Sequence, residues 1–288
     1  MNKLWKIIPA FILLTFSYNS LADSPVWKVT KAGKTVYLGG TVHVLSQSDY
    51  PLPKAFETAY AEASILVFEM DMSESQTLQF QQAMMKELTY QDGRTYADEL
   101  KPETVTKLHK YMTDRGVPIE GMNVFKPAML SMALTMLELQ RLGLGGTGVD
   151  AFYADRGLND SKTFKYLEKA EEQIAYLANM GKGHEDELIN YTLNDMDKLP
   201  QVMQQMKDAW RAGDGAKLYE VGGKEWQEEF PQSYDQLINI RNNNWMPHIE
   251  HYFTDDEIEF VLVGAMHLIG KDGVIKQLAA KGYQVTQL

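Results

Sequence analysis

The apolar residues of this chain gather in two matching runs, one near each end, and each run closes on a histidine. The first spans residues 35–43 (TVYLGGTVH) and the second spans residues 259–267 (EFVLVGAMH). Short apolar runs rich in valine, leucine and aromatic residues are typical of buried strands. The two histidines, His43 and His267, each follow a glycine by three positions. The pattern therefore predicts two strands that end in the same Gly-x-x-His motif.

The segment after each histidine repeats as well. In the first copy, a helical pattern over residues 53–63 precedes an apolar strand at residues 65–69. In the second copy, a helical pattern over residues 274–281 precedes a final strand at residues 283–288. Strand, helix and strand in this order form a βαβ unit, whose two strands run parallel. Two such halves predict an α/β (α+β) fold with a central mixed, partly parallel sheet.

Helical patterns fill much of the chain between these halves. Within residues 73–142, helical spacing covers residues 73–88 and the segments that begin at Pro102 and Pro127, and proline is favoured in the first turn of a helix. Methionines are frequent here, which at helical spacing favours an adaptable core or a partner surface over a metal site. We expect residues 73–142 to form a helical insertion or lid within a single domain of residues 23–288.

The remaining middle region contains a glycine-rich link, a strand and a long helix. Residues 143–148 (GLGGTG) match G-x-G-x-x-G, but they follow a helix, whereas the dinucleotide fingerprint follows a strand. We interpret them as a flexible link that caps a helix starting at Val149. Residues 162–167 are predicted to be a strand, and residues 237–253 a long helix that Pro247 interrupts.

The N-terminus has the pattern of an exported protein. Lysines precede an apolar stretch at residues 7–16, and Ser20-Leu21-Ala22 follows as a small-x-small site. This order predicts a secretory signal peptide over residues 1–22, cut after Ala22. The apolar stretch is short for a membrane span, and a retained N-terminal anchor is the alternative. We expect a periplasmic or secreted protein without stable membrane insertion after cleavage.

Composition narrows the classes of site and partner. The 288 residues include no cysteine, which excludes disulfides, zinc-thiolate sites and a thiol nucleophile. The formal net charge is −11, which argues against a nucleic-acid partner. The expected partner is a peptide or small-molecule substrate. The sequence makes no prediction of the oligomeric state.

The two histidines are the leading candidates for chemistry. Ligands of open α/β sheets bind beyond the carboxyl ends of the strands, where the pattern places both His43 and His267. Imidazoles that meet there suit a divalent transition metal such as Mn, Co or Zn. Glu69 ends an apolar strand at the same edge and is the best third ligand, with Asp71 as the reserve. Whether Glu69 binds metal or acts as a general base is left open.

Two further side chains fit a role beside such a site. Arg241 could bind a substrate carboxylate or stabilise an oxyanion, although it could equally be a structural arginine on a polar helix. Glu168 follows a strand as Glu69 does, so it is a second candidate base, or a cap for the next helix. His248 and His251 share one helical face and are expected to be solvated. No H-E-x-x-H, G-x-S-x-G or P-loop motif occurs in the sequence.

Taken together, the motifs resemble those of the TraB/GumN family over residues 26–288. They are Gly40-Thr41-Val42-His43, Val67-Phe68-Glu69-Met70-Asp71, Gly148-Val149-Asp150, Tyr166-Leu167-Glu168 with Glu172-Gln173, Arg241-Asn242 and Gly264-Ala265-Met266-His267. The resemblance implies a fold similar to that of erythromycin-esterase and ChaN-like proteins. It also implies kinship with the TIKI proteins, which are peptidases that prefer manganese or cobalt. On this basis His43, His267 and Glu69 would be metal or catalytic residues, and Arg241 their essential partner.

Three hypotheses for function follow. The first is an exported metal-dependent hydrolase, with a peptidase as the favoured class, in which His43, His267 and Glu69 hold a divalent metal that activates water. The second is a periplasmic metal, haem or peptide binding protein without turnover. The third is an interaction protein whose site has degenerated.

Overall fold

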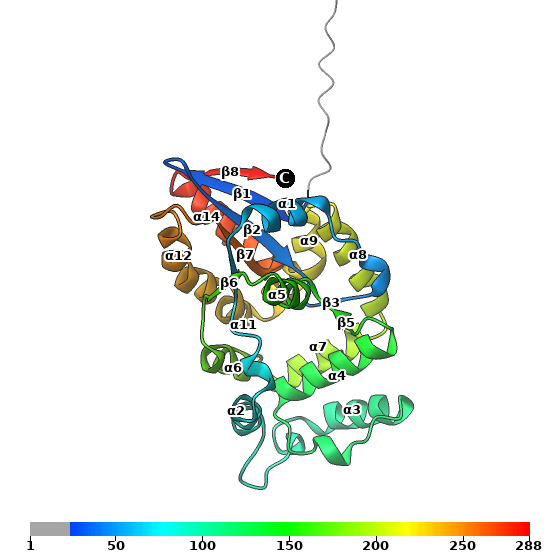
Figure 1. Ribbon diagram of the computed structural model, residues 1–288. Coiled ribbons are helices and arrows are strands. Elements are labelled where there is room, and N and C mark those ends of the chain that lie inside the picture. Colours follow the sequence, from blue (N-terminus) through cyan, green and yellow to red (C-terminus); the bar gives the residue numbers. More distant parts are fainter. Residues whose placement is uncertain (1–23) are drawn as a thin grey trace, which may run out of the picture.

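A six-stranded mixed sheet forms the centre of the protein in the computed structural model, which describes residues 24–288 (Figure 1). Its strands lie in the order β6-β4-β7-β2-β1-β8. Their bounds are β1 (Val26–Lys31), β2 (Lys34–Thr41), β4 (Ile65–Phe68), β6 (Thr163–Tyr166), β7 (Glu259–Gly264) and β8 (Gln284–Gln287). The four strands from β6 to β2 are mutually parallel, whereas β1 pairs antiparallel with both β2 and β8. The predicted mixed, partly parallel sheet is confirmed.

The two repeated strands are direct neighbours in this sheet. Strands β2 and β7 pair in parallel, with Thr41 opposite Gly264. Aligning the sequence repeat would instead put Gly40 opposite Gly264, so the strands are offset by one residue from their sequence alignment. Both strands nevertheless end at the same edge, because parallel neighbours share their direction. That edge carries both histidines.

Each half of the chain contains the predicted strand-helix-strand unit. In the first half, β2 and β4 flank α1 (Lys54–Glu62), and β7 lies between the two strands. In the second half, α14 (Val274–Ala280) joins β7 to β8, which runs in the same direction from the far side of β1. A buried cluster forms the main core, with valines, leucines and Phe260 from the strands and apolar residues from α1 and from the helix at Arg241–His251.

Helices make up most of the rest of the protein. Those not yet given are α2 (Leu78–Leu88), α3 (Pro102–Asp114), α4 (Pro127–Arg141), α5 (Val149–Asn159), α6 (Ala170–Ala178), α7 (Glu185–Asp195), α8 (Leu199–Arg211), α9 (Gly215–Gly222), α10 (Lys224–Glu229), α11 (Pro231–Tyr234), α12 (Arg241–His251) and α13 (Ala265–Leu268). Single 3-10 turns occur at η1 (Gln47–Asp49), η2 (Glu74–Gln76), η3 (Tyr96–Asp98) and η4 (Glu120–Met122). No helix among residues 24–288 has the length and apolar character that crossing a membrane requires.

The helices expected within residues 73–142 build a second hydrophobic core away from the sheet. Helices α3 and α4 pack with α7, and their shared core includes Leu108, Leu134 and Ile189. Figure 1 shows α2, α3 and α4 below the sheet, at the end toward which β2 points. Helix α7 lies outside residues 73–142. The second core therefore contains the expected insertion together with a helix from later in the chain.

Three local features differ from the sequence expectation. The predicted helix over residues 73–88 is two elements, since η2 ends at Gln76 and Thr77 then caps α2 by accepting a hydrogen bond from the Phe80 amide at 3.2 Å. The predicted interruption at Pro247 was wrong, because α12 continues through it. The irregular part is instead a π-helical segment, η5 (Asp235–Ile240), directly before Arg241. A small second sheet, β3 (Val44–Leu45) with β5 (Gly146–Thr147), was not predicted.

The expected signal peptide and its cleavage site lie outside the described residues.

Candidate functional site

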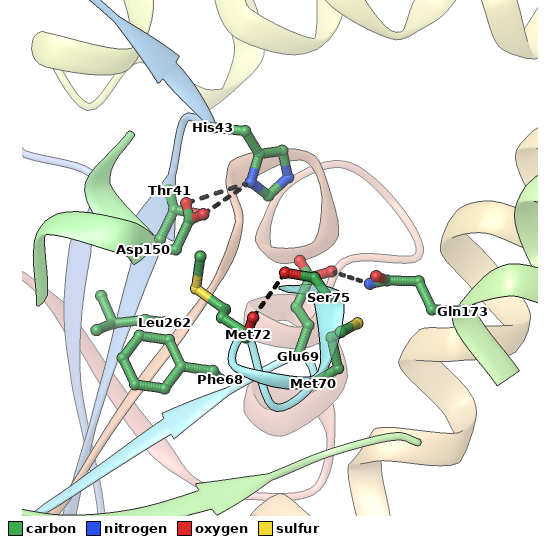
Figure 2. Close-up of a pocket in the computed structure, with 10 residues that line it drawn as sticks. All are labelled: Thr41, His43, Phe68, Glu69, Met70, Met72, Ser75, Asp150, Gln173 and Leu262. Carbon is green, nitrogen blue, oxygen red and sulfur yellow. Dashed lines mark hydrogen bonds and ion pairs between the residues drawn. The ribbon is translucent and has the colours of Figure 1, made fainter. Parts of the chain in front are cut away.

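A pocket opens at the carboxyl ends of β2, β4 and β7. Figure 2 shows His43 and Asp150 on one wall, Gln173 on the opposite side and Glu69 between them. About 540 Å³ of space lies within it, part of it open to solvent. Its remaining lining is largely apolar and consists of Thr41, Phe68, Met70, Met72, Ser75 and Leu262. The pocket therefore combines ionisable groups with an apolar surface suited to part of an organic ligand.

On the first wall, Asp150 fixes the orientation of His43. The Nδ1 nitrogen of His43 lies 3.2 Å from each carboxylate oxygen of Asp150, in the first turn of α5. The glycine-rich link makes this approach possible, because a Cβ atom on Gly148 would lie 2.2 Å from the His43 carbonyl oxygen. Desolvation by the surrounding pocket walls lowers the pKa of His43, but the hydrogen bonds and charge of Asp150 outweigh it and raise the pKa to about 9. The ring is therefore protonated at neutral pH, and a metal that binds Nε2 would have to displace its proton.

Glu69 follows β4 and turns its carboxylate into the pocket. Oε1 accepts a hydrogen bond from the Gly264 amide at 2.7 Å, and Oε2 accepts one from Nη2 of Arg241 at 2.6 Å. Burial raises the pKa of Glu69, but the charge of Arg241 outweighs this and lowers the pKa to about 2. Glu69 is therefore ionised at neutral pH.

Arg241 lies at the centre of the buried charges. Its Nε donates to Oε2 of Glu168 at 3.0 Å, and its Nη2 donates to Oε1 of Glu168 at 2.6 Å as well as to Glu69. The indole of Trp245, one turn later on α12, also donates to Glu168 at 3.1 Å. Burial raises the pKa of Glu168 despite Arg241. The π-helical segment η5 ends directly before Arg241, as such segments often do near functional residues.

His267 lies in α13, a single helical turn after β7, and is 4% exposed. Its Nδ1 lies 2.7 Å from the Asn242 side-chain oxygen, and its Nε2 lies 3.1 Å from Nη1 of Arg241. An asparagine oxygen only accepts and a guanidinium only donates, so His267 carries its proton on Nδ1 and a lone pair on Nε2. Burial, together with Arg241, lowers the pKa of His267 to about 3. The imidazole is therefore neutral.

The three proposed metal ligands converge on one point beside Gly264. A Cβ atom on this glycine would lie 3.3 Å from Oε1 of Glu69, 3.5 Å from Cδ2 of His267 and 3.6 Å from Nε2 of His43. Both imidazoles are held through Nδ1, by Asp150 and by Asn242, which is how metal-binding histidines are commonly oriented. The donor types also suit a divalent transition metal.

The spacing of these donors is not that of a closed metal site. Across residues 24–288, no group of three or more His, Cys, Asp or Glu side chains is placed so that it could hold a metal ion. At this pocket, Nη1 of Arg241 also occupies the lone pair of His267. His43 and Glu69 face the pocket as they are, whereas His267 faces Arg241.

The structure brings together the five main residues that the sequence singled out: His43, His267, Glu69, Arg241 and Glu168. The reserve ligand Asp71 does not join them, because its Oδ1 accepts hydrogen bonds from the amide and hydroxyl of Ser73. His248 and His251 are exposed on α12, as expected.

Sequence reasoning assigned no role to four polar residues that complete the network. Asp150 and Asn242 orient the histidines, and Trp245 contacts Glu168. Gln173 donates to Oε1 of Glu168 at 3.1 Å and to Oε2 of Glu69 at 3.4 Å. The available signal was adjacency, since Asn242 follows Arg241 and Asp150 follows the glycine-rich link.

Comparison with known proteins identifies the family of the chain. Searches of curated proteins and of solved structures gave no match. The model of the TraB/PrgY/gumN family, by contrast, matches residues 25–287, which is nearly the whole chain and includes every residue of the pocket. The protein therefore belongs to the TraB/PrgY/gumN family.

Proposed function

We propose that the protein is an exported metal-dependent hydrolase that cleaves peptides in the pocket at the carboxyl ends of β2, β4 and β7. One observation carries the proposal. Two histidines are each held through Nδ1 by an Asp or Asn oxygen, and both rings and the Glu69 carboxylate lie within 4 Å of the position that a Cβ atom on Gly264 would take. Two oriented imidazoles and a carboxylate are the donor set of many catalytic metal sites.

The residues that would hold the metal are His43 through Nε2, Glu69 through its carboxylate and His267 through Nε2. Manganese, cobalt and zinc all accept such ligands. When bound, a divalent ion supplies a lowered pKa for a bound water and polarises a carbonyl group. His267 is neutral and Glu69 is ionised, so both are already in the protonation state that metal binding requires.

The acidic and basic side chains around the proposed metal site have two kinds of role. Some would act on the substrate, and others hold those side chains in position. Glu69 lines the pocket and, being ionised, can orient a water molecule or bind the ion. Glu168 is a positioning residue rather than the base, because Arg241, Trp245 and Gln173 occupy its oxygens. Arg241 would stabilise negative charge that develops on a substrate oxygen.

The apolar lining of the pocket supports an organic substrate and also a second candidate function. Phe68, Met70, Met72 and Leu262 offer a surface on which an apolar side chain could rest, and methionines adapt to different shapes. The same surface would serve a periplasmic protein that binds a metal, haem or peptide without turnover. Product formation distinguishes the two candidates.

Metal analysis of the mature protein, purified without chelator, tests the proposal. We expect one equivalent of a transition metal in the wild type after incubation with Mn²⁺, Co²⁺ or Zn²⁺, and loss of that metal in a folded His43→Ala/His267→Ala variant. The matched control is His248→Ala/His251→Ala, which removes two exposed imidazoles from α12. The loaded wild type is then incubated with a peptide library.

Each outcome of this experiment has a clear meaning. Cleavage by the wild type and by the control, but not by the His43→Ala/His267→Ala variant, supports the hydrolase. Stoichiometric metal without cleavage of any peptide supports the binding protein. No metal in the wild type with any of the three ions contradicts the hydrolase and leaves, of the binding functions, only haem or peptide. N-terminal sequencing of protein from the periplasmic fraction tests export, with Asp23 as the expected first residue.

A further inference from the structure

The guanidinium of Arg241 already bridges two of the three donors assigned to the metal. Its Nη1 lies 3.1 Å from Nε2 of His267, and its Nη2 lies 2.6 Å from Oε2 of Glu69. All three side chains are largely buried, with 8% of the Arg241 side chain and 12% of the Glu69 side chain exposed and His267 4% exposed. The guanidinium of Arg241 therefore occupies the buried end of the proposed metal site.

Arg241 and a metal ion cannot both use Nε2 of His267. A neutral imidazole has one lone pair, and the proton on Nδ1 of this ring is donated to Asn242. The lone pair on Nε2 therefore either accepts the Nη1 hydrogen bond or binds a cation. Glu69 is less restricted, because only its Oε2 faces Arg241 while its Oε1 lies on the Gly264 side.

We propose that Arg241 is an internal competitor for the metal: it bridges His267 and Glu69 in the metal-free protein and withdraws from His267 when a divalent ion binds. This inference rests on the proposed metal site. It names a second role for a residue otherwise expected only to face the substrate.

Arg241 can leave His267 without losing its place, because several of its contacts do not involve the metal ligands. Glu168 accepts hydrogen bonds from Nε at 3.0 Å and from Nη2 at 2.6 Å, and the Leu237 carbonyl accepts one from Nη1 at 3.3 Å. The guanidinium carbon also lies 4.8 Å from the centre of the Trp245 ring. These contacts hold the charge beside the site in either state.

The exchange has two consequences. First, the metal binds more weakly than it would to the same ligands without Arg241, because a ligand must displace whatever already occupies its site. Second, a hydrogen-bond donor on Nη1 becomes available beside the loaded site, where a substrate oxygen could accept it. Metal loading would thus release the group that assists the reaction.

The test measures the affinity of the full mature chain for Mn²⁺ by calorimetry or equilibrium dialysis. Arg241→Gln removes the charge and the fork of donors, and Arg241→Lys keeps the charge but cannot bridge two acceptors in the same geometry. We expect both variants to bind Mn²⁺ at least tenfold more tightly than the wild type. Arg94→Gln is the matched control. It removes a positive charge that is exposed and that contacts none of the proposed metal ligands, so the affinity should stay unchanged.

Two variants keep the test decisive if one of them does not fold, and folding is checked by circular dichroism. The inference is overturned if every folded Arg241 variant binds Mn²⁺ as the wild type does, or more weakly. Binding by a variant but not by the wild type supports it strongly. Metal binding without cleavage of peptides would remove the proposed hydrolase and leave this inference standing. Absence of binding in all proteins overturns both.

Arg241→Lys also separates competition from a merely structural role. If Arg241 competes for the metal and assists the substrate, this variant binds Mn²⁺ more tightly and cleaves more slowly when saturated with metal. A residue that only supported the fold would show weaker binding and slower cleavage together.

Discussion

Nδ1 of His43 lies at the same distance, 3.2 Å, from both carboxylate oxygens of Asp150. The carboxylate is the fixed member of this pair, since 16% of its side chain is exposed against 64% of the imidazole. Asp150 sits in the first turn of α5, where a negative charge is favoured by the helix dipole. An exposed histidine is thereby held with Nε2 toward the pocket before any ligand arrives.

Asp150→Asn should weaken metal binding while leaving the fold intact. The amide removes the charge that supports the imidazole, and the loss of such an outer partner typically costs about 10–100-fold in affinity or activity. Titration with Mn²⁺ checks this. Asp155→Asn, an exposed position on the same helix, should bind as the wild type does. Equal affinity in the two variants would show that Asp150 does not support His43.

Gly148→Ala should disturb the same wall from the backbone. The added Cβ atom would lie 2.2 Å from the His43 carbonyl oxygen, so the link or the histidine must shift. We expect a loss of roughly 1–3 kcal/mol in the free energy of unfolding, together with weaker metal binding. Denaturant unfolding and Mn²⁺ titration measure the two effects. Gly121→Ala, whose Cβ atom would meet nothing within 4 Å, is the control and should change neither.

Glu168→Gln should destabilise the folded protein by about 1–3 kcal/mol, because it leaves Arg241 without one of its two buried carboxylates and replaces an acceptor oxygen by a donor. The side chain of Glu168 is only 5% exposed, so water cannot substitute for the lost interaction. Thermal or denaturant unfolding measures the change. The exposed Glu171→Gln, three residues later, should remain within about 0.5 kcal/mol of the wild type.

His267 makes stability fall on acidification of the metal-free protein. Its folded-state pKa is about 3, against an ordinary value of 6.5, so between these values the unfolded chain binds the proton and the folded chain does not. The free energy of unfolding therefore rises with pH from about 3 to 6.5. Each unit of difference is worth about 1.4 kcal/mol at most.

Denaturant unfolding at several pH values tests this expectation. The pH dependence between 4.5 and 6.5 should be shallower in a folded His267→Gln variant than in the wild type. The lower bound excludes the acidic half of the titration of Glu69, whose ordinary pKa is 4.5. His251→Gln, which removes an exposed imidazole, should keep the wild-type slope. The same slope in all three proteins would refute the assignment.

The sequence was informative where a residue's place follows from strand direction. His43, Glu69 and His267 each follow a buried parallel strand, and parallel strands present their ends at one edge. The periodicity of residues 35–43 and 259–267 was therefore enough to predict the sheet and to bring these side chains to one place. Glu168 followed from the same reasoning, because β6 is the neighbour of β4.

The sequence was less informative where placement depends on packing between distant segments. On a continuous strand the side chains of Glu69 and Asp71 would point to the same face. The strand ends at Phe68, however, and Asp71 accepts a hydrogen bond from the Ser73 amide instead. Asp150 reaches His43 because Gly148 packs against the backbone of His43 and β5, just before it, pairs with β3. No local sequence pattern reveals this contact between distant segments. The continuation of α12 through Pro247 likewise reflects tertiary packing that overrides local preference.

The position of β7 in the sheet has a consequence for how much of the chain the pocket needs. This strand lies between β2 and β4 although it comes after both in the chain, and it supplies both the Gly264 amide that binds Glu69 and the start of the turn that carries His267. A nascent chain that ends before Glu259 has a gap at the centre of its sheet and lacks Leu262 of the pocket lining as well as His267. The pocket therefore cannot be completed while the chain is being made until β7 and α13 have been added, and a fragment that stops before them does not contain it.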